Sequence, residues 1–374
     1  MTSPVTTASR VRNAGLDAAR AIAMMFVVGT HAAVSFMVTP IGWAVQDRSQ
    51  HLGVDLWVWV VRAFAMPTFF WLAGYFSRVL LVKEGVSGYL RNRVLRIFVP
   101  LAVALVPCSL VVGAIWDWGR EVTARATVAD NIPKFQSSEL EIFLGHLWFL
   151  YYLLWLSLAA LAITALVRHL RVRVPVVAVP VAVTFGVLVY LRALHTDTPL
   201  GFIPNLPILV YMGGFFAWGW LVHARPEELA SYARRSWHAL ALSAPLLAVV
   251  IVTLARGLSV IDSPPVYAIA ASSLFSVAMM VFLLGACTRY LARPRPLLQL
   301  ASRSSYWFYV LHLPIVVALQ VALSQVAIPG PLKYVIIVAV TTAACVGSYA
   351  LVSAIVPRGR ARDRTGYTDA SAVR

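Results

Sequence analysis

Charged residues are scarce in this sequence, and acidic residues are the scarcest of them. Only 12% of the 374 residues are Asp, Glu, Lys or Arg, while 60% are hydrophobic; a soluble domain is typically about half apolar and about a quarter charged. This composition excludes an ordinary water-soluble protein and predicts a chain that lies in a lipid bilayer. The 15 acidic residues are outnumbered by 31 Lys and Arg, which gives a net charge of +16. Such an excess can indicate nucleic-acid binding, but in a membrane protein it is first compared with the basic bias of cytoplasmic loops.

Cysteine is also scarce. The three cysteines, Cys108, Cys287 and Cys345, all lie in apolar stretches, so neither a disulfide framework nor a zinc-binding spacing can be built from them. We expect each to be a small apolar residue inside a helix bundle. No metal site and no bound cofactor are predicted.

Long apolar stretches make up most of the chain. About 20 apolar residues cross a bilayer as a helix, and about ten such stretches follow one another, separated by turns that carry Arg, Pro and Gly. The sequence therefore predicts an all-α fold, a polytopic membrane helix bundle of about ten transmembrane helices. The expected spans are approximately 16–38, 54–82, 94–116, 143–167, 174–192, 206–223, 237–256, 264–288, 305–325 and 332–356.

The basic residues distinguish the two sides of the membrane. Twenty-two of the 31 Lys and Arg lie in alternate connections that include both termini, whereas seven lie in the other connections. By the positive-inside rule both termini are cytoplasmic, and the charge needs no nucleic acid to explain it. We expect a multi-pass protein of the plasma membrane. Its expected parts are a cytoplasmic segment over 1–15, a membrane domain over 16–356 and a basic, disordered cytoplasmic tail over 357–374.

The first expected span carries three ionisable residues, Asp17, Arg20 and His31. Such residues are costly in a bilayer, so each is a candidate functional residue. At about 100° per residue, the eleven positions from Arg20 to His31 leave an offset of about 20°, which places both on one helix face. Because an imidazole can take and return a proton near neutral pH, His31 is the candidate catalytic base, with Arg20 and Asp17 setting its electrostatics. The structural alternatives are an ion pair at the helix end and a histidine that is hydrogen-bonded between helices.

Three further arginines are candidates. Arg62 lies inside the second span, either as an electrophilic stabiliser or as the counter-ion of a buried acid. Arg93 and Arg96 lie at the cytoplasmic mouth of the third span. Their spacing places them on adjacent turns of one helix face, which suits them to hold the phosphates of a donor; interfacial anchoring is the alternative.

Polar residues also gather near the start of the ninth span. Ser305, Tyr309 and His312 are spaced i, i+4, i+7 and share one face; they either join helices by hydrogen bonds or contact the substrate. His146 and Trp148 open the fourth span, where aromatic residues usually form an interfacial belt. His146 at this outer mouth is a further candidate for contact with an acceptor.

These motifs, in this order, resemble the acyltransferase 3 family of integral membrane acyltransferases. In LDAARAIAMMFVVGTH, Arg20 and His31 match the family's pattern of Arg, ten residues, His, and RAFAMPTFFWLAGYF is similar to its FFxLSGF region. RNRVLRIFVP, HLWFLYYLL and SSYWFYVLHLP resemble three further family motifs. MPTFFWLAGYF together with HLWFLYYLL is most similar to the glucan biosynthesis protein C branch, although Ala73 replaces a Ser and one extra residue precedes Pro100.

The resemblance implies an enzyme that takes an acyl group from a cytoplasmic acyl-CoA, acetyl-CoA or succinyl-CoA, and delivers it to a hydroxyl, often of a sugar, at or across the membrane. Members of the branch are thought to succinylate periplasmic glucans. The expected partners are acyl-CoA, the lipid bilayer and an acceptor that is a glycan, a lipid-linked sugar or a glycosylated small molecule; a homodimer remains open. A secondary transporter is the rival function, because proline-broken spans with buried charge are typical of transporters. The chain shows no internal repeat, however, and its buried charges concentrate in spans one to three and nine.

Overall fold

The computed structural model describes residues 13–39, 41–125, 144–166, 175–257 and 263–355. The regular structure within these ranges is helical, with no β-strand, which confirms the predicted all-α class. The expected tail over 357–374 and nearly all of the expected N-terminal segment over 1–15 lie outside the described residues.

Ten α-helices lie in the described ranges, and each overlaps one expected span. Seven helical stretches are long and apolar enough to cross a membrane, one of them a continuous run from Leu52 to Thr123 that holds two of the expected spans. Two further helices are apolar but shorter. The protein is therefore a membrane protein with several spans. The helices are α1 (Ala14–Ala33), α2 (Leu52–Arg93), α3 (Val99–Arg125), α4 (Trp148–Leu166), α5 (Ala178–Leu191), α6 (Leu206–Val222), α7 (Pro226–Ala255), α8 (Val266–Tyr290), α9 (Pro296–Ser324) and α10 (Gly330–Ile355), with short segments η1 (Val34–Phe36), η2 (Val94–Phe98) and η3 (Gly145–Leu147).

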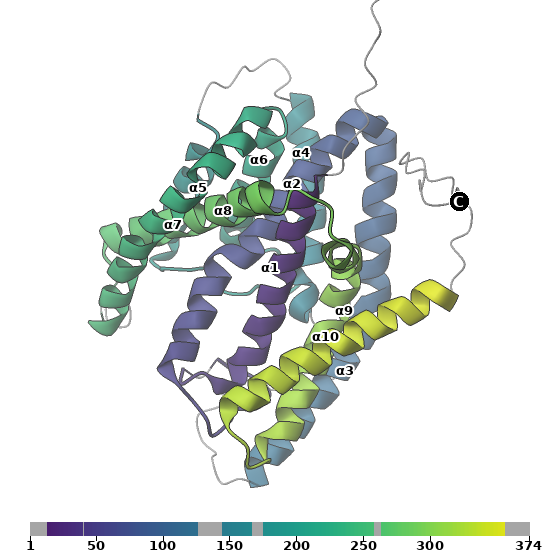
Figure 1. Cartoon of the computed structure of the whole chain (residues 1–374), viewed down its shortest axis with the longest axis vertical. Helices are drawn as coiled ribbons and strands as arrows, with labels where there is room; N and C mark the ends of the chain where they lie inside the picture. The colour runs from purple at the N-terminus through teal and green to yellow at the C-terminus, as the bar shows by residue number, and fades with distance from the viewer. Residues whose placement is uncertain (1–12, 40, 126–143, 167–174, 258–262, 356–374) are drawn as a thin grey trace, which may run out of the picture.

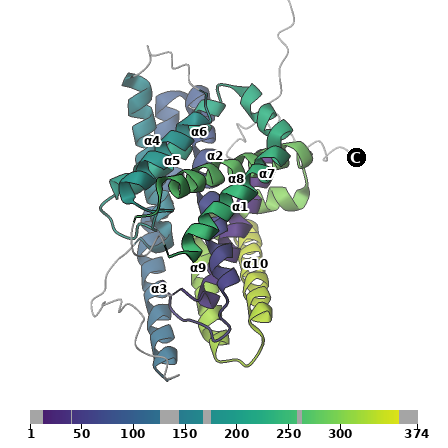
Figure 2. The ribbon, with the colours of Figure 1, turned by 90° about the vertical axis from the view of Figure 1, so that its left-hand side faces the viewer.

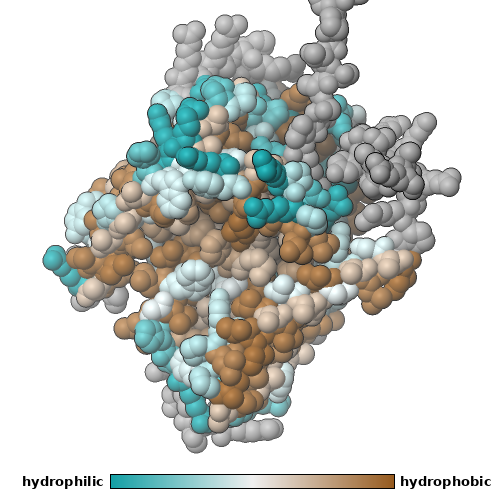
Figure 3. Space-filling view, in the orientation of Figure 1, coloured by the Kyte–Doolittle hydropathy of each residue, from teal (hydrophilic) through white to brown (hydrophobic). Residues whose placement is uncertain are grey.

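Helix α1 lies in the interior of the bundle. It begins in the upper half of the molecule in Figure 1, below the tops of α2 and α4, and runs downward beside α9; the end of the molecule toward which α1 runs is called the lower end. In its most apolar window, 72% of the residues are buried, against 17% for α10, because α1 is packed against α2, α8 and α9. Apolar side chains also cover much of the face shown in Figure 3, while hydrophilic ones gather toward the upper end. This distribution is what contact with lipid requires.

Helix α2 rises to the upper end and turns there (Figure 1). The turn is at Gly85, whose φ of 66° lies in the left-handed region that glycine adopts without strain. The chain then descends through the π-helical segment η2 into α3. The expected third span is therefore the continuation of a long descending helix.

Two glycines bring α2 and α6 close together. A Cβ on Gly74 would lie 1.9 Å from the carbonyl oxygen of Phe216, and a Cβ on Gly219 would lie 1.9 Å from that of Trp71. Small residues are common where membrane helices approach this closely. The pair of glycines fixes α6 against the middle of α2.

Gly74→Ala is expected to lower the free energy of unfolding by about 1–3 kcal/mol, because the added methyl group forces the α6 backbone away. The measurement is the melting temperature of the purified protein in detergent, followed by tryptophan fluorescence. Gly113→Ala in α3 is the matched control, since its added Cβ meets no atom within 4 Å. Equal melting temperatures for the two variants would contradict the close packing.

Candidate functional site

Two histidines from distant parts of the sequence meet in the bundle. Nδ1 of His31, on α1, lies 2.9 Å from Nε2 of His312, on α9, and the two rings are stacked with centroids 5.0 Å apart. Nearer the start of both helices, Ser302 donates a hydrogen bond of 2.8 Å to Asp17. Early residues of α1 thus contact early residues of α9 and late residues contact late ones, so the two helices run parallel.

The hydrogen bonds fix the proton positions on both rings. Nδ1 of His312 lies 2.9 Å from each of two carbonyl oxygens, those of Phe308 and Tyr309, and a carbonyl can only accept. Nδ1 of His312 therefore carries the proton, and its Nε2 is the acceptor. His31 must then donate from Nδ1, which leaves its own Nε2 with a free lone pair. Nε2 of His31 makes no hydrogen bond to any described residue, and the side chain is only half-buried.

A third histidine joins the cluster because of a proline. Pro314 has no backbone N–H, so within α9 the carbonyl of Val310 loses its normal helical partner. Nε2 of His146 takes that place, 3.0 Å from the Val310 oxygen. The Tyr309 hydroxyl donates to the backbone carbonyl of His146, and the His146 ring lies 5.6 Å from that of His312. His146, predicted at the outer mouth of a span, is instead buried in the cluster.

A tryptophan and a glutamine that the sequence did not single out complete the surroundings of His31. The ring of Trp43 is stacked on that of His31, with centroids 5.9 Å apart and an interplanar angle of 14°. Trp43 donates its indole N–H to Gln320 over 2.8 Å. Gln320 in turn donates to the backbone carbonyls of His31 and Ala32 at the end of α1.

The geometry of the three histidines has the features of a proton-transfer site: an accessible imidazole nitrogen with a lone pair, and a partner that fixes its tautomer. Comparison with protein families identifies the family of the chain. Residues 13–350 match the family model for an acyltransferase domain. The chain belongs to the acyltransferase 3 family. This family assignment confirms the resemblance.

The similarity to individual relatives is lower. The chain is 26% identical, over 148 residues, to proteins named glucans biosynthesis protein C in Salmonella paratyphi B, Salmonella enteritidis and Salmonella gallinarum. The aligned part is 40% of this chain and 38% of each relative, so the chain spans about two-fifths of the length of the curated relatives it matches. No solved structure matches the chain.

The other predicted catalytic residues, Asp17 and Arg20, lie nearer the upper end. Asp17 is buried and forms an ion pair with Arg20 at 3.8 Å. The guanidinium of Arg20 also lies over the ring of Phe76, 4.8 Å from its centroid. His31 is eleven positions after Arg20, which is about 16 Å along the axis of α1. Asp17 and Arg20 therefore form a second polar group on the same helix, at some distance from the histidines.

Arg62 lies on α2 and is half-buried. It donates one hydrogen bond, of 3.3 Å, to the backbone carbonyl of Thr196 in the connection between α5 and α6. A guanidinium has five N–H groups, so the hydrogen bond to Thr196 leaves Arg62 with donor capacity for a ligand.

The two mouth arginines have different surroundings. Arg93 is half-buried, donates to the Ser77 hydroxyl on α2 at 3.4 Å and lies over the ring of Tyr89 at 5.0 Å. Arg96 is exposed and belongs to the π-helical segment η2. Arg93 therefore packs against the part of α2 before the Gly85 turn, whereas Arg96 is exposed.

The structure also shows the contacts of the two remaining predicted residues, Ser305 and Trp148. The hydroxyl of Ser305 donates to the carbonyl of Ser302 in its own helix, so Ser302 and not Ser305 contacts Asp17. Trp148 is buried, with its ring 5.9 Å from that of Phe70 and 5.6 Å from that of Tyr152. In the part of the chain that the structure describes, no group of His, Cys, Asp and Glu residues could hold a metal ion.

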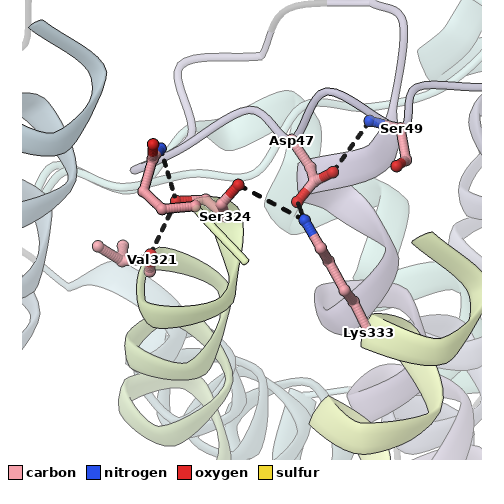
Figure 4. Close-up of polar contacts among 6 residues, drawn as sticks. Asp47, Ser49, Val321, Ser324 and Lys333 are labelled. Atoms are coloured by element: carbon pink, nitrogen blue, oxygen red, sulfur yellow. Dashed lines mark hydrogen bonds and ion pairs between the residues drawn. The ribbon is translucent and has the colours of Figure 1, made fainter. Parts of the chain in front are cut away.

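The lower end holds a buried ion pair that the sequence did not predict. Nζ of Lys333, at the start of α10, lies 2.6 Å from a carboxylate oxygen of Asp47, and both side chains are at most 4% exposed. Asp47 also accepts from the backbone N–H of Ser49, and Lys333 approaches the carbonyl of Ser324 at 3.5 Å (Figure 4). Removing one partner of a buried pair leaves an uncompensated charge, which costs about 3–5 kcal/mol. The pair therefore ties the loop before α2 to α10.

Proposed function

We propose that this acyltransferase moves an acyl group from acyl-CoA to a hydroxyl of a glycan, with His31 as the general base. The observation that carries the proposal is the tautomer of His31: His312 holds its Nδ1 proton, so its Nε2 has a lone pair that can accept a proton from a hydroxyl. A positioned general base typically contributes about 10²–10⁴-fold to the rate.

In the proposed reaction, the proton of the acceptor hydroxyl passes through His31 to the leaving group. Nε2 of His31 takes the proton of the acceptor hydroxyl while the hydroxyl oxygen attacks the thioester carbonyl carbon. The carbon–sulfur bond then breaks, and the leaving CoA thiolate receives the proton from His31. Attack by Nε2 itself, giving an acyl-histidine intermediate, is the alternative to direct transfer.

An oxyanion forms on the thioester carbonyl during this reaction, and a nearby cation or donor would stabilise it. The Tyr309 hydroxyl already donates a hydrogen bond to the backbone carbonyl of His146. Arg62 keeps donor capacity after its hydrogen bond to Thr196. Arg62 is therefore the better candidate for this role, while Tyr309 and His146 hold α9 against the start of α4.

In this proposal, acyl-CoA reaches the site from the upper end of the molecule. The excess of Lys and Arg in connections on that side supports a cytoplasmic upper end, with both termini in the cytoplasm of a plasma-membrane protein. Arg93 and Arg96 lie just below the Gly85 turn and are proposed to hold the CoA phosphates. The acceptor proposed is a glucan, because the relatives are named for glucan biosynthesis.

The test uses purified protein, acetyl-CoA or succinyl-CoA, and a glucan oligosaccharide. The proposal predicts release of free CoA thiol that depends on the glucan, together with a glucan that is heavier by one acyl group. A transporter would leave acyl-CoA intact and instead carry solute into sealed vesicles. Solute uptake without thiol release would contradict the proposal.

Arg96→Ala is expected to raise the KM for acyl-CoA about tenfold with little change in kcat, since a charge-assisted phosphate contact contributes mainly to binding. Steady-state thiol release measures both constants. Arg235→Ala is the control, because Arg235 is an exposed arginine on α7. If the two variants have the same KM, Arg96 is an interfacial anchor and the donor phosphates bind elsewhere.

A further inference from the structure

The described residues that precede α2 pack against the bundle. Residues 41–51, called here the strap, place Ala44 and Val45 in an apolar cluster with Val112 of α3 and Val317 of α9. The contact with α3 is close, because a Cβ on Gly119 would lie 2.2 Å from the carbonyl oxygen of Ala44. The strap is therefore packed between helices at the lower end.

The strap carries Trp43, the residue stacked on His31. Trp116 of α3 packs against Trp43 edge to face, with ring centroids 5.3 Å apart. With its indole N–H bound to Gln320 and its ring between His31 and Trp116, Trp43 has its position fixed on three sides. Gln320 links the same contact to the carbonyls that end α1.

The buried ion pair holds the strap in this position. Asp47 is four residues from Trp43, and its carboxylate is bound by Lys333 of α10 (Figure 4). The backbone N–H of Asp47 donates to Ser35 over 2.7 Å, and that of His51 donates to Phe36 over 3.1 Å. The strap is thus fastened both to η1 and to α10.

We propose that the strap is the lower wall of the acyl-transfer site, and that Trp43 is a positioning residue that keeps water away from His31. The inference rests on the proposed function of His31 as a base. A base that activates an acceptor hydroxyl also activates water. The water oxygen would attack the thioester carbonyl carbon and give its proton to His31, the carbon–sulfur bond would break, and the thiolate would take that proton, leaving a carboxylic acid and free CoA. The strap suppresses this hydrolysis, because a closed site excludes water.

The first experiment measures how acyl groups divide between water and acceptor. With acetyl-CoA and a glucan oligosaccharide, the ratio of hydrolysis to transfer is expected to rise about tenfold in Trp43→Ala. The same rise is expected when Asp47→Asn and Lys333→Met are combined, which removes both charges together. Trp43→Phe, which keeps a ring over His31, and Lys83→Met, which replaces an exposed lysine on α2, should stay near the wild-type ratio. Equal losses of hydrolysis and transfer in Trp43→Ala would mean that the strap is only structural and would overturn the inference.

The second experiment does not depend on catalysis. Diethyl pyrocarbonate modifies accessible neutral histidines, and mass spectrometry gives the rate at each one. His31 is expected to react several-fold faster in Trp43→Ala and in the Asp47→Asn, Lys333→Met variant than in wild type, relative to exposed His238. An unchanged rate at His31 in both variants would refute the claim that the strap shields His31 from solvent. If His31 reacts faster in both variants as expected but His31→Gln still transfers acyl groups, the proposed function of His31 is wrong, while the shielding of His31 by the strap is still supported.

Discussion

Replacing His31 with glutamine is expected to lower kcat for acyl transfer by about a thousandfold, within the range that a general base contributes. Glutamine has no nitrogen lone pair that can take a proton at neutral pH. Its amide can still donate to Nε2 of His312, so the contact between α1 and α9 is retained. The measurement is glucan-dependent release of CoA thiol at saturating acyl-CoA.

The control for His31→Gln is His238→Gln, the same substitution at an exposed position on α7. Both variants should accumulate in the membrane and melt as the wild type does, and His238→Gln should keep full activity. If His31→Gln retained more than half of the wild-type kcat, His31 would be a packing residue and not the base.

His312→Phe is expected to lower kcat by about a hundredfold or more while leaving the KM for acyl-CoA near the wild-type value. Phenylalanine fills the buried position but removes the acceptor for the Nδ1 proton of His31. Without that acceptor the His31 tautomer and ring orientation are no longer fixed, and the loss of an orienting partner for a catalytic histidine is costly.

Partial recovery of kcat by a second substitution distinguishes a positioning role of His312 from a structural one. His312→Gln offers an amide oxygen to the Nδ1–H of His31, so it should recover part of kcat relative to His312→Phe. A purely structural role predicts instead that both variants lose kcat and gain KM in proportion to their loss of folded protein. Such a parallel loss, measured by thermal melting alongside kinetics, would contradict the claim that His312 acts by fixing the tautomer of His31.

The helices were the predictable part of this molecule. Their hydropathy is a local property, so each expected span overlaps a helix. The ends of the helices depend on contacts that hydropathy does not report. The third span was expected over 94–116, but the turn at Gly85 lets one descending helical path run through η2 to Arg125. Helices α5 and α6 were expected as spans, yet both are shorter than the seven stretches long enough to cross a membrane.

The sequence indicates individual candidate residues of the site, but it does not indicate which of them contact each other. His31 and His312 each stood out because a titratable side chain is costly in a bilayer, but their separation of 281 positions gives no sequence signal that they meet. Pro314 did contain a signal for His146, because a proline in a helix frees the carbonyl four residues earlier. The sequence could have shown that Val310 needs a donor, though not which one.

The strap was missed for a different reason. Lys333 is one of the seven basic residues in the connections that do not include the termini, and the positive-inside rule treats such a lysine as solvated. Gln320 is an amide within an apolar span, which the rule for polar residues in membranes could have selected. Asp47 and Trp43 lie between helices, where neither hydropathy nor helical spacing distinguishes a buried segment from a solvated loop.

The central claim is that Nε2 of His31 accepts the acceptor's proton during acyl transfer. The most direct test is mass spectrometry of the glucan after incubation with acyl-CoA and protein reconstituted in vesicles, using wild type and His31→Gln in parallel. Wild type should yield glucan that is heavier by one acyl group, and His31→Gln should yield none above background. The same acylated glucan, formed by His31→Gln at the wild-type rate, would contradict the claim.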